Sequence, residues 1–290
     1  MLNKCKVCNK KNFEIVWNDK IRSGKNNFTK KKEIIFRCLS CDLVFLKNRR
    51  KNLENSAVAR SLYNKNNSIK EFLSFHKPRE LKKLNFFKKY ISFKNKNILE
   101  SNCGAGILLA TLKNGSKSTS GIDDNSYKDY LNKNGHNFFP SFDRVIQQKK
   151  KFDIILSLSE LEHKYDPTTF LKKMKKALSK SGRIILRVPN YHNVYSMLLG
   201  NSFYKYDYRT SHNYYFSCKN LTLLIKKVGL KIEKKIGLQE YDFNHLLQYL
   251  RSKKRVTGPY KKVLSYKNES IIKKNIENSF TSTSLVYILN

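Results

Sequence analysis

The sequence contains no uninterrupted run of about 18 apolar residues, the length that a membrane-spanning helix requires, so we expect no membrane span. The first ten residues, MLNKCKVCNK, lack the apolar stretch of a secretory signal peptide, and the chain is therefore expected to be cytoplasmic. Acidic residues are scarce, since 22 Asp and Glu stand against 59 Lys and Arg. Apolar residues still make up 40% of the 290, including 18 Phe and 17 Tyr, which is enough for a sizeable core and excludes global disorder.

Arginine is also scarce, because 47 of the basic residues are Lys and only 12 are Arg. The net charge of +37 suggests nucleic-acid binding, but phosphate and base recognition favours the planar fork of Arg. The Lys residues, together with 31 Asn, are spread along the whole chain. We interpret them mainly as solvated surface, with a loose attraction to acidic polymers.

Two Cys-x-x-Cys pairs form the most specific local pattern, and they comprise Cys5, Cys8, Cys38 and Cys41. Four thiolates satisfy the tetrahedral coordination of a structural zinc, whereas two disulfides or free thiols are the alternative. Three short apolar runs around the pairs predict the strands of a zinc ribbon, at Phe13–Trp17, Glu33–Arg37 and Leu43–Leu46. Cys103 and Cys218 lie outside the pattern and are expected to be ordinary buried thiols.

The domain organisation follows from changes in composition. Residues 1–46 form the expected ribbon, and the polar residues 47–77 form a linker with one weak helix at Ser56–Tyr63. A helix is expected to begin at Pro78, which suits a first helical position. Residues 78–290 then form the main domain.

Strands and helices alternate through the main domain, which predicts an α/β fold with a doubly wound parallel sheet. The expected strands are Ile98–Leu99, Ser118–Ile122, His136–Phe139, Phe152–Leu158, Arg183–Val188, Leu230–Ile236 and Ser284–Leu289. The expected helices are Ile107–Leu112, Ser126–Asn134, one that begins at Asp166-Pro167 and ends at Gly182, and one from Ser217 to Gly229. Asp143 is expected in a loop after the strand His136–Phe139. Residues 191–216 and 239–283 interrupt the alternation, and both are rich in Tyr, His and Asn. They follow strand ends, where such folds bind ligands, and are candidates for a substrate pocket or lid.

The stretch Asn97–Gly106, NILESNCGAG, predicts a strand that ends in Glu100, a turn of small residues and then a helix. Such a turn presents free backbone N–H groups to a ligand, although an ordinary αβ turn also uses a Gly-x-Gly pair. Asp123 lies 17 residues beyond Gly106, one helix and one strand later, so it reaches the tip of the adjacent strand. A helix N-cap is the alternative role for this carboxylate.

Several stretches together resemble the class I S-adenosylmethionine (SAM)-dependent methyltransferases. They are NILESNCGAG, SGIDDNS, FDIILSLSELEHKYDP, LSKSGRIILRVPN and HNYYFSCKNLTLLIKKVGL. More narrowly, the chain is similar to a bacterial subgroup with an N-terminal zinc-binding ribbon, associated with sugar or surface-polysaccharide modification. This resemblance implies a Rossmann-like, seven-stranded sheet with the last strand antiparallel, SAM as cofactor and a structural zinc.

The resemblance also implies a set of cofactor-binding residues: Glu100, Asn102, Cys103, Gly104, Gly106, Asp123, Asp143 and Leu158. Glu100 and the turn backbone would hold the methionine end of SAM, Asp123 the ribose hydroxyls, and Asp143 would lie near the adenine. Asn102 departs from the family pattern, which has glycine at this position. Asn tolerates a positive φ better than most residues, so we expect the turn to be retained.

A hydroxyl acceptor would also need a group that takes its proton. His163, after the fourth strand, is the first candidate for this base, and a histidine that bridges loop backbone is the alternative reading. His212 and His192 are further candidates on the first insertion. His245, on the second insertion, is assigned either to substrate contact or to packing.

Three functions are consistent with these features. The favoured one is methyl transfer to a small-molecule or sugar acceptor by in-line displacement. An RNA methyltransferase is the second, although the sequence lacks an Asn-Pro-Pro-Tyr or Asp-Pro-Pro-Tyr signature and has Leu158–His163 in that place. A cofactor-binding module without catalysis, suggested by Asn102, is the third.

Overall fold

The computed structural model describes residues 4–24, 27–51, 69–252 and 260–290. Its larger sheet has seven strands in the order β10-β11-β8-β7-β4-β5-β6. Their bounds are β4 Asn97–Ser101, β5 Ser118–Ile122, β6 Asn137–Phe139, β7 Phe152–Leu158, β8 Leu178–Pro189, β10 Ile232–Leu238 and β11 Ser284–Leu289. The β11 strand is antiparallel to both neighbours, β8 and β10, and all other pairs are parallel. The expected seven-stranded Rossmann-like sheet with an antiparallel last strand is therefore confirmed.

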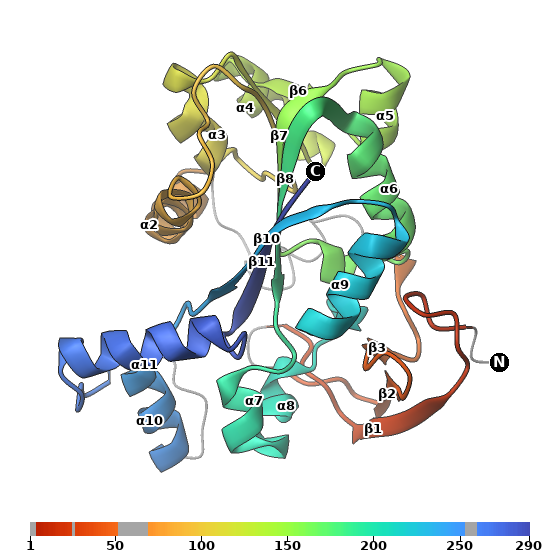
Figure 1. Ribbon diagram of the computed structural model, residues 1–290, viewed down its shortest axis with the longest axis vertical. Helices are drawn as coiled ribbons and strands as arrows, with labels where there is room; N and C mark the ends of the chain where they lie inside the picture. The colour runs from red at the N-terminus through yellow and green to blue at the C-terminus, as the bar shows by residue number, and fades with distance from the viewer. Residues whose placement is uncertain (1–3, 25–26, 52–68, 253–259) are drawn as a thin grey trace.

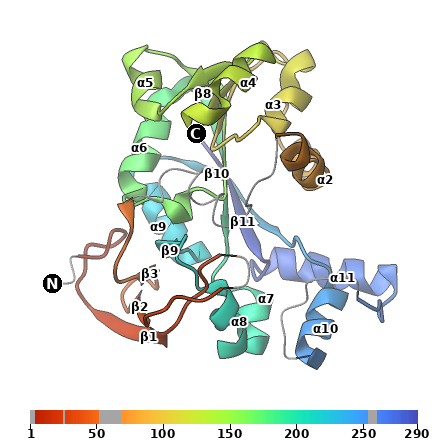
Figure 2. The ribbon, with the colours of Figure 1, turned by 180° about the vertical axis from the view of Figure 1, so that it is seen from behind.

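Helices cover both faces of this sheet, as Figure 1 shows with the sheet nearly edge-on. One face carries α2 Ile69–Phe87 and α3 Ile107–Leu112, with α4 Lys128–Lys133 beside them. The opposite face carries α5 Phe142–Gln147, α6 Pro167–Ala177 and α9 Cys218–Lys227. Figure 2 shows the same two layers from behind.

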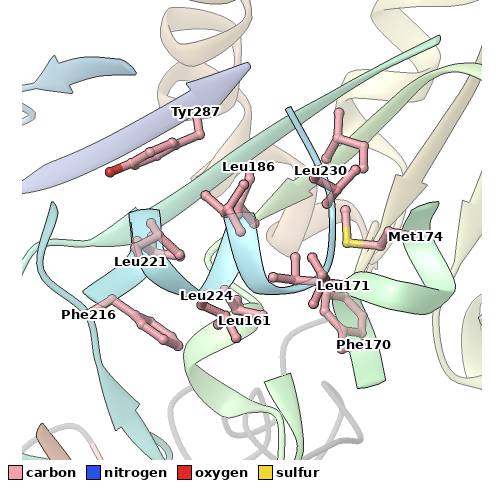
Figure 3. Close-up of a cluster of buried hydrophobic side chains, with 14 of the residues drawn as sticks. Leu161, Phe170, Leu171, Met174, Leu186, Phe216, Leu221, Leu224, Leu230 and Tyr287 are labelled. Carbon is pink, nitrogen blue, oxygen red and sulfur yellow. The ribbon is translucent and has the colours of Figure 1, made fainter. Parts of the chain in front are cut away.

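The strands are apolar on both faces because each face packs against helices. Successive side chains of a strand point to opposite faces, so Ile98 packs with α2 and α3 whereas Leu99 belongs to the cluster of α6 and α9. In Figure 3, Leu171 and Met174 of α6 and Leu224 of α9 converge beneath the sheet. This packing fixes the position of the sheet, and with it the position of the strand ends, where ligands bind in such folds.

A second sheet has the order β1-β2-β3-β9, and all of its pairs are antiparallel. Its bounds are β1 Phe13–Asp19, β2 Glu33–Cys38, β3 Val44–Leu46 and β9 Tyr214–Tyr215. The last strand of this sheet, β9, comes from the first insertion, and its Tyr214 pairs with Phe45 of β3, 169 positions earlier in the chain. The N-terminal strands and the first insertion therefore form one sheet.

The two insertions add four helices to the strand-end side of the main sheet. The first insertion contains α7 Val194–Leu199 and α8 Asn201–Asp207, and the second contains α10 Phe243–Ser252 and α11 Tyr266–Asn278. In Figures 1 and 2 these helices lie together at one end of the molecule, with the N-terminal sheet next to α8. None of the helices among the described residues is long and apolar enough to cross a membrane.

Three local expectations were wrong. Pro78 lies inside α2, which already begins at Ile69, so it does not mark the start of that helix. Asp143 lies in the first turn of α5 and not in a loop, because Ser141 caps that helix by accepting a hydrogen bond from the backbone N–H of Arg144 at 3.3 Å. Gly182 does not end a helix: α6 ends at Ala177 and Gly182 lies within β8.

A glycine is needed at position 182 of β8 for a steric reason, since an added Cβ would lie 2.8 Å from the backbone oxygen of Phe152. The glycine therefore permits close strand approach. The weak helix expected at Ser56–Tyr63 lies outside the described residues.

Candidate functional site

A cavity of about 1480 Å³ opens at the carboxyl ends of β4, β5, β7 and β8. Residues of α2 and of both insertions complete its lining. The position is the one that parallel α/β sheets use for ligands, because the strand ends and the loops that follow them meet there. The cavity is large enough for a nucleoside-sized cofactor and a second small molecule.

The turn after β4 is held in a left-handed conformation at three positions. Asn102, Gly104 and Gly106 have φ values of 60°, 56° and 71°. The backbone N–H of Asn102 donates to the carbonyl of Ile122 at 2.8 Å, which ties the turn to the end of β5. Asn102 therefore adopts the conformation for which glycine is usual, as its tolerance of positive φ predicts.

Asp123 fixes the same turn from the adjacent strand. Its Oδ2 accepts a hydrogen bond from the backbone N–H of Gly104 at 2.6 Å, and its Oδ1 accepts one from Asp124 N–H at 2.7 Å. The helix cap that follows belongs to Asp124, whose Oδ1 accepts from Ser126 N–H at 2.8 Å. A carboxylate has about four acceptor positions, so Asp123 keeps capacity for a ligand while it holds the glycine turn.

Most residues that the resemblance assigns to the cofactor line this cavity. They are Glu100, Asn102, Cys103, Asp123, Asp143 and Leu158. Within the described chain, Gly104 and Gly106 shape the turn but are not part of that lining. Asp143 is the most exposed of the carboxylates, with 58% of its side chain accessible, and its Oδ2 accepts a charged hydrogen bond from Lys173 at 2.6 Å.

His163 and His212, two of the proposed bases, both line the cavity and lie against each other, although 49 positions separate them. Their ring centroids lie 4.9 Å apart at an interplanar angle of 78°. The Nδ1 of His163 hydrogen-bonds to the carbonyl oxygen of Ser211. A carbonyl only accepts, so this nitrogen carries the proton and Nε2 of His163 is left as an acceptor.

The surroundings of this histidine pair shift the pKa values of two buried groups, His212 and Glu162. Burial lowers the pKa of His212 well below 6.5, and the positive charge of Arg209 acts in the same direction. Burial also raises the pKa of Glu162, although His163 and Arg187 act against this shift. Glu162 is 1% exposed, and its Oε1 lies 4.0 Å from Nε2 of His163. Perturbed, buried groups that face a cavity are a common property of active sites.

The remaining two histidine candidates, His192 and His245, differ in whether they line the cavity. His192 hydrogen-bonds through Nε2 to Asp42 of the N-terminal sheet and does not belong to the described lining of the cavity. His245 does line the cavity, where its Nδ1 bonds to the hydroxyl of Tyr195 at 2.8 Å and its ring stacks on Tyr241 at 5.0 Å.

Sequence reasoning missed three contributions to the site. Glu162 was visible only as half of a Glu-His pair, and nothing local indicated its burial. Arg187 bridges Ser159 and Glu240 and donates to Ser284 Oγ at 2.6 Å. This arginine holds the pKa of Glu240 at about 2, although burial alone would raise it. The aromatic side chains of the insertions were noted only as a compositional bias.

The charge of the cavity differs from that of the whole chain. Among the described residues that line it, ten are Lys or Arg and ten are Asp or Glu, whereas the whole chain has 59 and 22. Twelve lining residues are Phe or Tyr. The excess positive charge therefore lies outside this cavity.

The four N-terminal cysteines form a compact cluster. Sγ of Cys5 lies 3.6 Å from Sγ of Cys41, and Sγ of Cys8 lies 3.5 Å from Sγ of Cys38. All four sulfur atoms lie within 4.8 Å of one another. Four sulfurs at about 2.3 Å from a tetrahedral zinc are about 3.8 Å apart, so the cluster fits such an ion, whereas a disulfide would require about 2.05 Å.

Comparison with known proteins gives a family for this arrangement. Residues 71–235 match the model of the methyltransferase domain family. A ubiquinone biosynthesis O-methyltransferase of Hydrogenovibrio crunogenus is 26% identical over 220 residues, which cover 69% of this chain and 87% of the relative. A tRNA U34 carboxymethyltransferase of Nautilia profundicola is 31% identical over 113 residues, covering 36% of this chain and 38% of the relative.

A solved structure shows the same fold. It is a chain from the complex between the Haloferax volcanii Trm112 methyltransferase activator and the putative methyltransferase, and it aligns with a TM-score of 0.52. The alignment covers 83% of this chain and 97% of that one at 13% sequence identity.

Proposed function

Because the chain belongs to the methyltransferase domain family and is a SAM-dependent methyltransferase, we propose that its methyl acceptor is a hydroxyl oxygen of a small, ring-bearing molecule, such as a sugar or an aromatic compound. One observation carries this proposal: the cavity is charge-balanced and rich in aromatic side chains on a chain of net charge +37. A polyanion would be favoured by a basic cavity, whereas a ring stacks on aromatic faces.

The acceptor end is formed by aromatic residues from both insertions. Tyr195 of α7, Tyr241, His245 and Tyr249 line one part of the cavity, and Tyr195 lies 6.2 Å from Tyr241 and 6.4 Å from Tyr249 between ring centroids. Their hydroxyls offer hydrogen bonds at the edge of an apolar surface. This combination suits a ring that carries hydroxyl groups.

The cofactor end is assigned to the turn and to Asp123. In this proposal, Asp123 accepts hydrogen bonds from the ribose hydroxyls, while Glu100 and the turn backbone hold the methionine part. Asn102 and Ser101 support the assignment, because their Oδ1 and Oγ are buried and make no hydrogen bond within the described chain. SAM supplies a methyl group on a positively charged sulfur, so the protein has to align the acceptor and manage its proton.

The group of Glu162, His163 and His212 stands between the two ends and is assigned to the activation of the acceptor hydroxyl. Nε2 of His163 is the accepting nitrogen, and His212 is kept neutral by its burial. Alignment alone contributes roughly 7–11 kcal/mol toward such a reaction, and proton removal adds about 10²–10⁴-fold.

We further propose that the four cysteines hold a structural zinc ion. The sulfur geometry supports this, and four protein ligands leave no position open for catalysis. The ion would hold together the start of the chain and the β2–β3 connection, from which β3 pairs with β9.

The test is methyl transfer from radiolabelled SAM to three acceptor pools: hydroxylated aromatic acids, nucleotide-linked sugars and total tRNA. We expect labelling of one of the first two, and at least a tenfold rise in acceptor KM for Tyr241→Ala. Tyr266→Ala is the matched control, because Tyr266 is 88% exposed on α11. Labelling of tRNA alone would instead assign the activity to RNA, and failure to bind SAM at millimolar concentration would favour a non-catalytic module.

A further inference from the structure

Three potential metal ligands come together beside the acceptor end of the cavity. Glu162 and His163 belong to the short helix η4, Leu161–His163, and His212 comes from the first insertion. One ligand atom from each lies within 4.8 Å of the other two. All three residues line the cavity, so an ion held by them would face the acceptor.

Glu162 makes no side-chain hydrogen bond that would account for its buried position. Its side chain is 1% exposed, and neither carboxylate oxygen makes a hydrogen bond to another described residue. The nearest imidazole nitrogen, Nε2 of His163, is 4.0 Å away and too distant for a hydrogen bond. A buried carboxylate without a hydrogen bond is costly, which suggests that a cation completes the site.

His163 is oriented as a metal ligand. Its Nδ1 donates to the backbone carbonyl of Ser211, and this leaves Nε2 directed toward Glu162. Metal-binding histidines are usually fixed in this way by a hydrogen bond from the other ring nitrogen. The backbone on both sides is fixed as well, since Asn213 donates from its N–H to the carbonyl of Glu162 at 2.9 Å and from Nδ2 to that of His163 at 2.8 Å.

Two of the arginines near the cluster, Arg187 and Arg209, are paired with carboxylates other than Glu162. Arg187 pairs with Glu240, and Nη2 of Arg209 lies 2.9 Å from Oδ1 of Asp207. Glu160, which also lines the cavity, pairs with Lys164 at 2.8 Å. Unlike these carboxylates, Glu162 makes no hydrogen bond to a Lys or Arg side chain among the described residues.

We propose that Glu162, His163 and His212 bind one divalent transition-metal ion that holds the acceptor hydroxyl. Two imidazoles and one carboxylate form a ligand set that suits Zn²⁺, Mn²⁺ or Fe²⁺ and leaves further positions open. Ligand distances of about 2.1 Å place such atoms roughly 3.0–3.4 Å apart, so the cluster contracts by about 1 Å around the ion. This site differs from the four-cysteine cluster in both ligand type and open coordination.

The inference rests on the proposed hydroxyl acceptor and specifies how its activation occurs. A divalent cation lowers the pKa of a bound hydroxyl, so the O–H bond breaks and its proton passes to water. The oxygen then forms a bond to the methyl carbon of SAM, while the carbon–sulfur bond breaks and leaves a neutral thioether. His163 and His212 act here as ligands, so the bound ion replaces Nε2 of His163 as the group that activates the hydroxyl.

The test is Mn²⁺ binding to the zinc-loaded protein, followed by electron paramagnetic resonance of the free ion. Mn²⁺ prefers oxygen and nitrogen ligands and leaves a four-thiolate zinc in place. We expect one Mn²⁺ or one additional Zn²⁺ per chain, with at least tenfold weaker binding in Glu162→Gln and His212→Gln. His245→Gln is the matched control, because this histidine lines the same cavity outside the cluster, and its metal binding is expected to be unchanged.

The zinc content and the SAM affinity of each variant are also measured, because they report whether the fold is intact. The absence of an additional ion in the wild type, or equal binding by wild type and Glu162→Gln, would overturn the metal site. Methylation of a ring-bearing acceptor without any such ion would leave the proposed function standing. Specific Mn²⁺ binding without methylation of any ring-bearing acceptor would instead refute the acceptor class and retain the site.

Discussion

The two ends of the cavity are built in different ways. The proposed cofactor end consists of one continuous turn, residues 102–106, and a carboxylate on the next strand that accepts hydrogen bonds from backbone N–H groups. The proposed acceptor end combines η4 with both insertions, and its side chains come from positions between 162 and 249. Short-range backbone geometry therefore sets the first end, whereas long-range packing sets the second.

Because long-range packing sets the acceptor end, the N-terminal sheet helps to position it. The β3 strand pairs with β9, and the backbone N–H of Leu46 donates to the carbonyl of Asn213 at 3.0 Å. Asn213 in turn bonds to the backbone of Glu162 and His163. The cysteine cluster thus supports the acceptor end through a chain of hydrogen bonds, while the cofactor end has no such dependence among the contacts described above.

The largest expected effect is that of Cys5→Ser, which should impair the acceptor end and leave the cofactor end nearly unchanged. Loss of one thiolate should remove one zinc per chain and lower the free energy of unfolding by roughly 3 kcal/mol or more, because zinc binding contributes directly to folding. Methyl-transfer turnover should fall, and the SAM dissociation constant should change by less than about threefold. Zinc analysis, thermal unfolding and calorimetric SAM titration measure these quantities.

Cys218→Ser is the matched control for this change, since Cys218 lies outside the cluster and the zinc should be retained. A metal-free wild type would refute the zinc site. A parallel loss of SAM affinity in Cys5→Ser would show that the two ends are not independent.

The second effect is expected at the cofactor end. Asp123→Ala removes the acceptor of the Gly104 and Asp124 N–H groups, and a hydrogen bond to a charged group is worth about 1.5–3 kcal/mol. We expect SAM to bind at least about tenfold more weakly, measured by calorimetry. Asp124→Ala, which removes the side-chain acceptor of the Ser126 N–H at a short helix, should change the affinity far less. Equal affinities for Asp123→Ala and the wild type would show that the cofactor site is elsewhere.

A smaller effect tests the conformation of the turn. Asn102→Gly should preserve both stability and SAM affinity, because glycine adopts a φ of 60° freely. Asn102→Val should destabilise the protein by about 1–2 kcal/mol in urea unfolding, since β-branched residues are strained in this region. Asn95→Val is a useful control, because Asn95 has a φ of 56° just before β4. It should cost similar stability and leave SAM binding unchanged, and a loss of SAM binding there would contradict the assignment.

The smallest effect concerns pH at the strand beside the cofactor end. Nδ1 of buried His136 lies 2.7 Å from Oγ1 of Thr119 on β5, and burial, with the charge of Lys113, lowers the pKa of His136 below 6.5. The unfolded chain therefore binds this proton more readily, and the contribution of His136 to stability falls as pH decreases below about 6.5.

Urea unfolding at pH 7.5 and 5.0 measures this contribution. We expect His136→Gln to lose less stability than the wild type between the two values, by up to about 1.4 kcal/mol per pH unit. Identical pH dependence of the two proteins would contradict the burial of a neutral imidazole at this position.

The sequence by itself determined the local structure closely. The bounds expected for α3, β5, β7 and β11 agree with the structure, since apolar periodicity and turn residues act over a few neighbouring positions. The two Cys-x-x-Cys pairs and the glycine turn were also visible, because each is a short pattern with its own chemistry. Pro78 misled the expectation because a first-turn preference does not reveal the residues that precede it in the same helix.

Only the tertiary structure decided how the site is assembled. It buried Glu162, brought His163 against His212, and directed His192 to Asp42 of the N-terminal sheet instead of into the cavity. It also showed that Asp123 holds the glycine turn. These contacts join residues that lie far apart in the chain, and they depend on how the helices and both sheets pack, which no local pattern encodes.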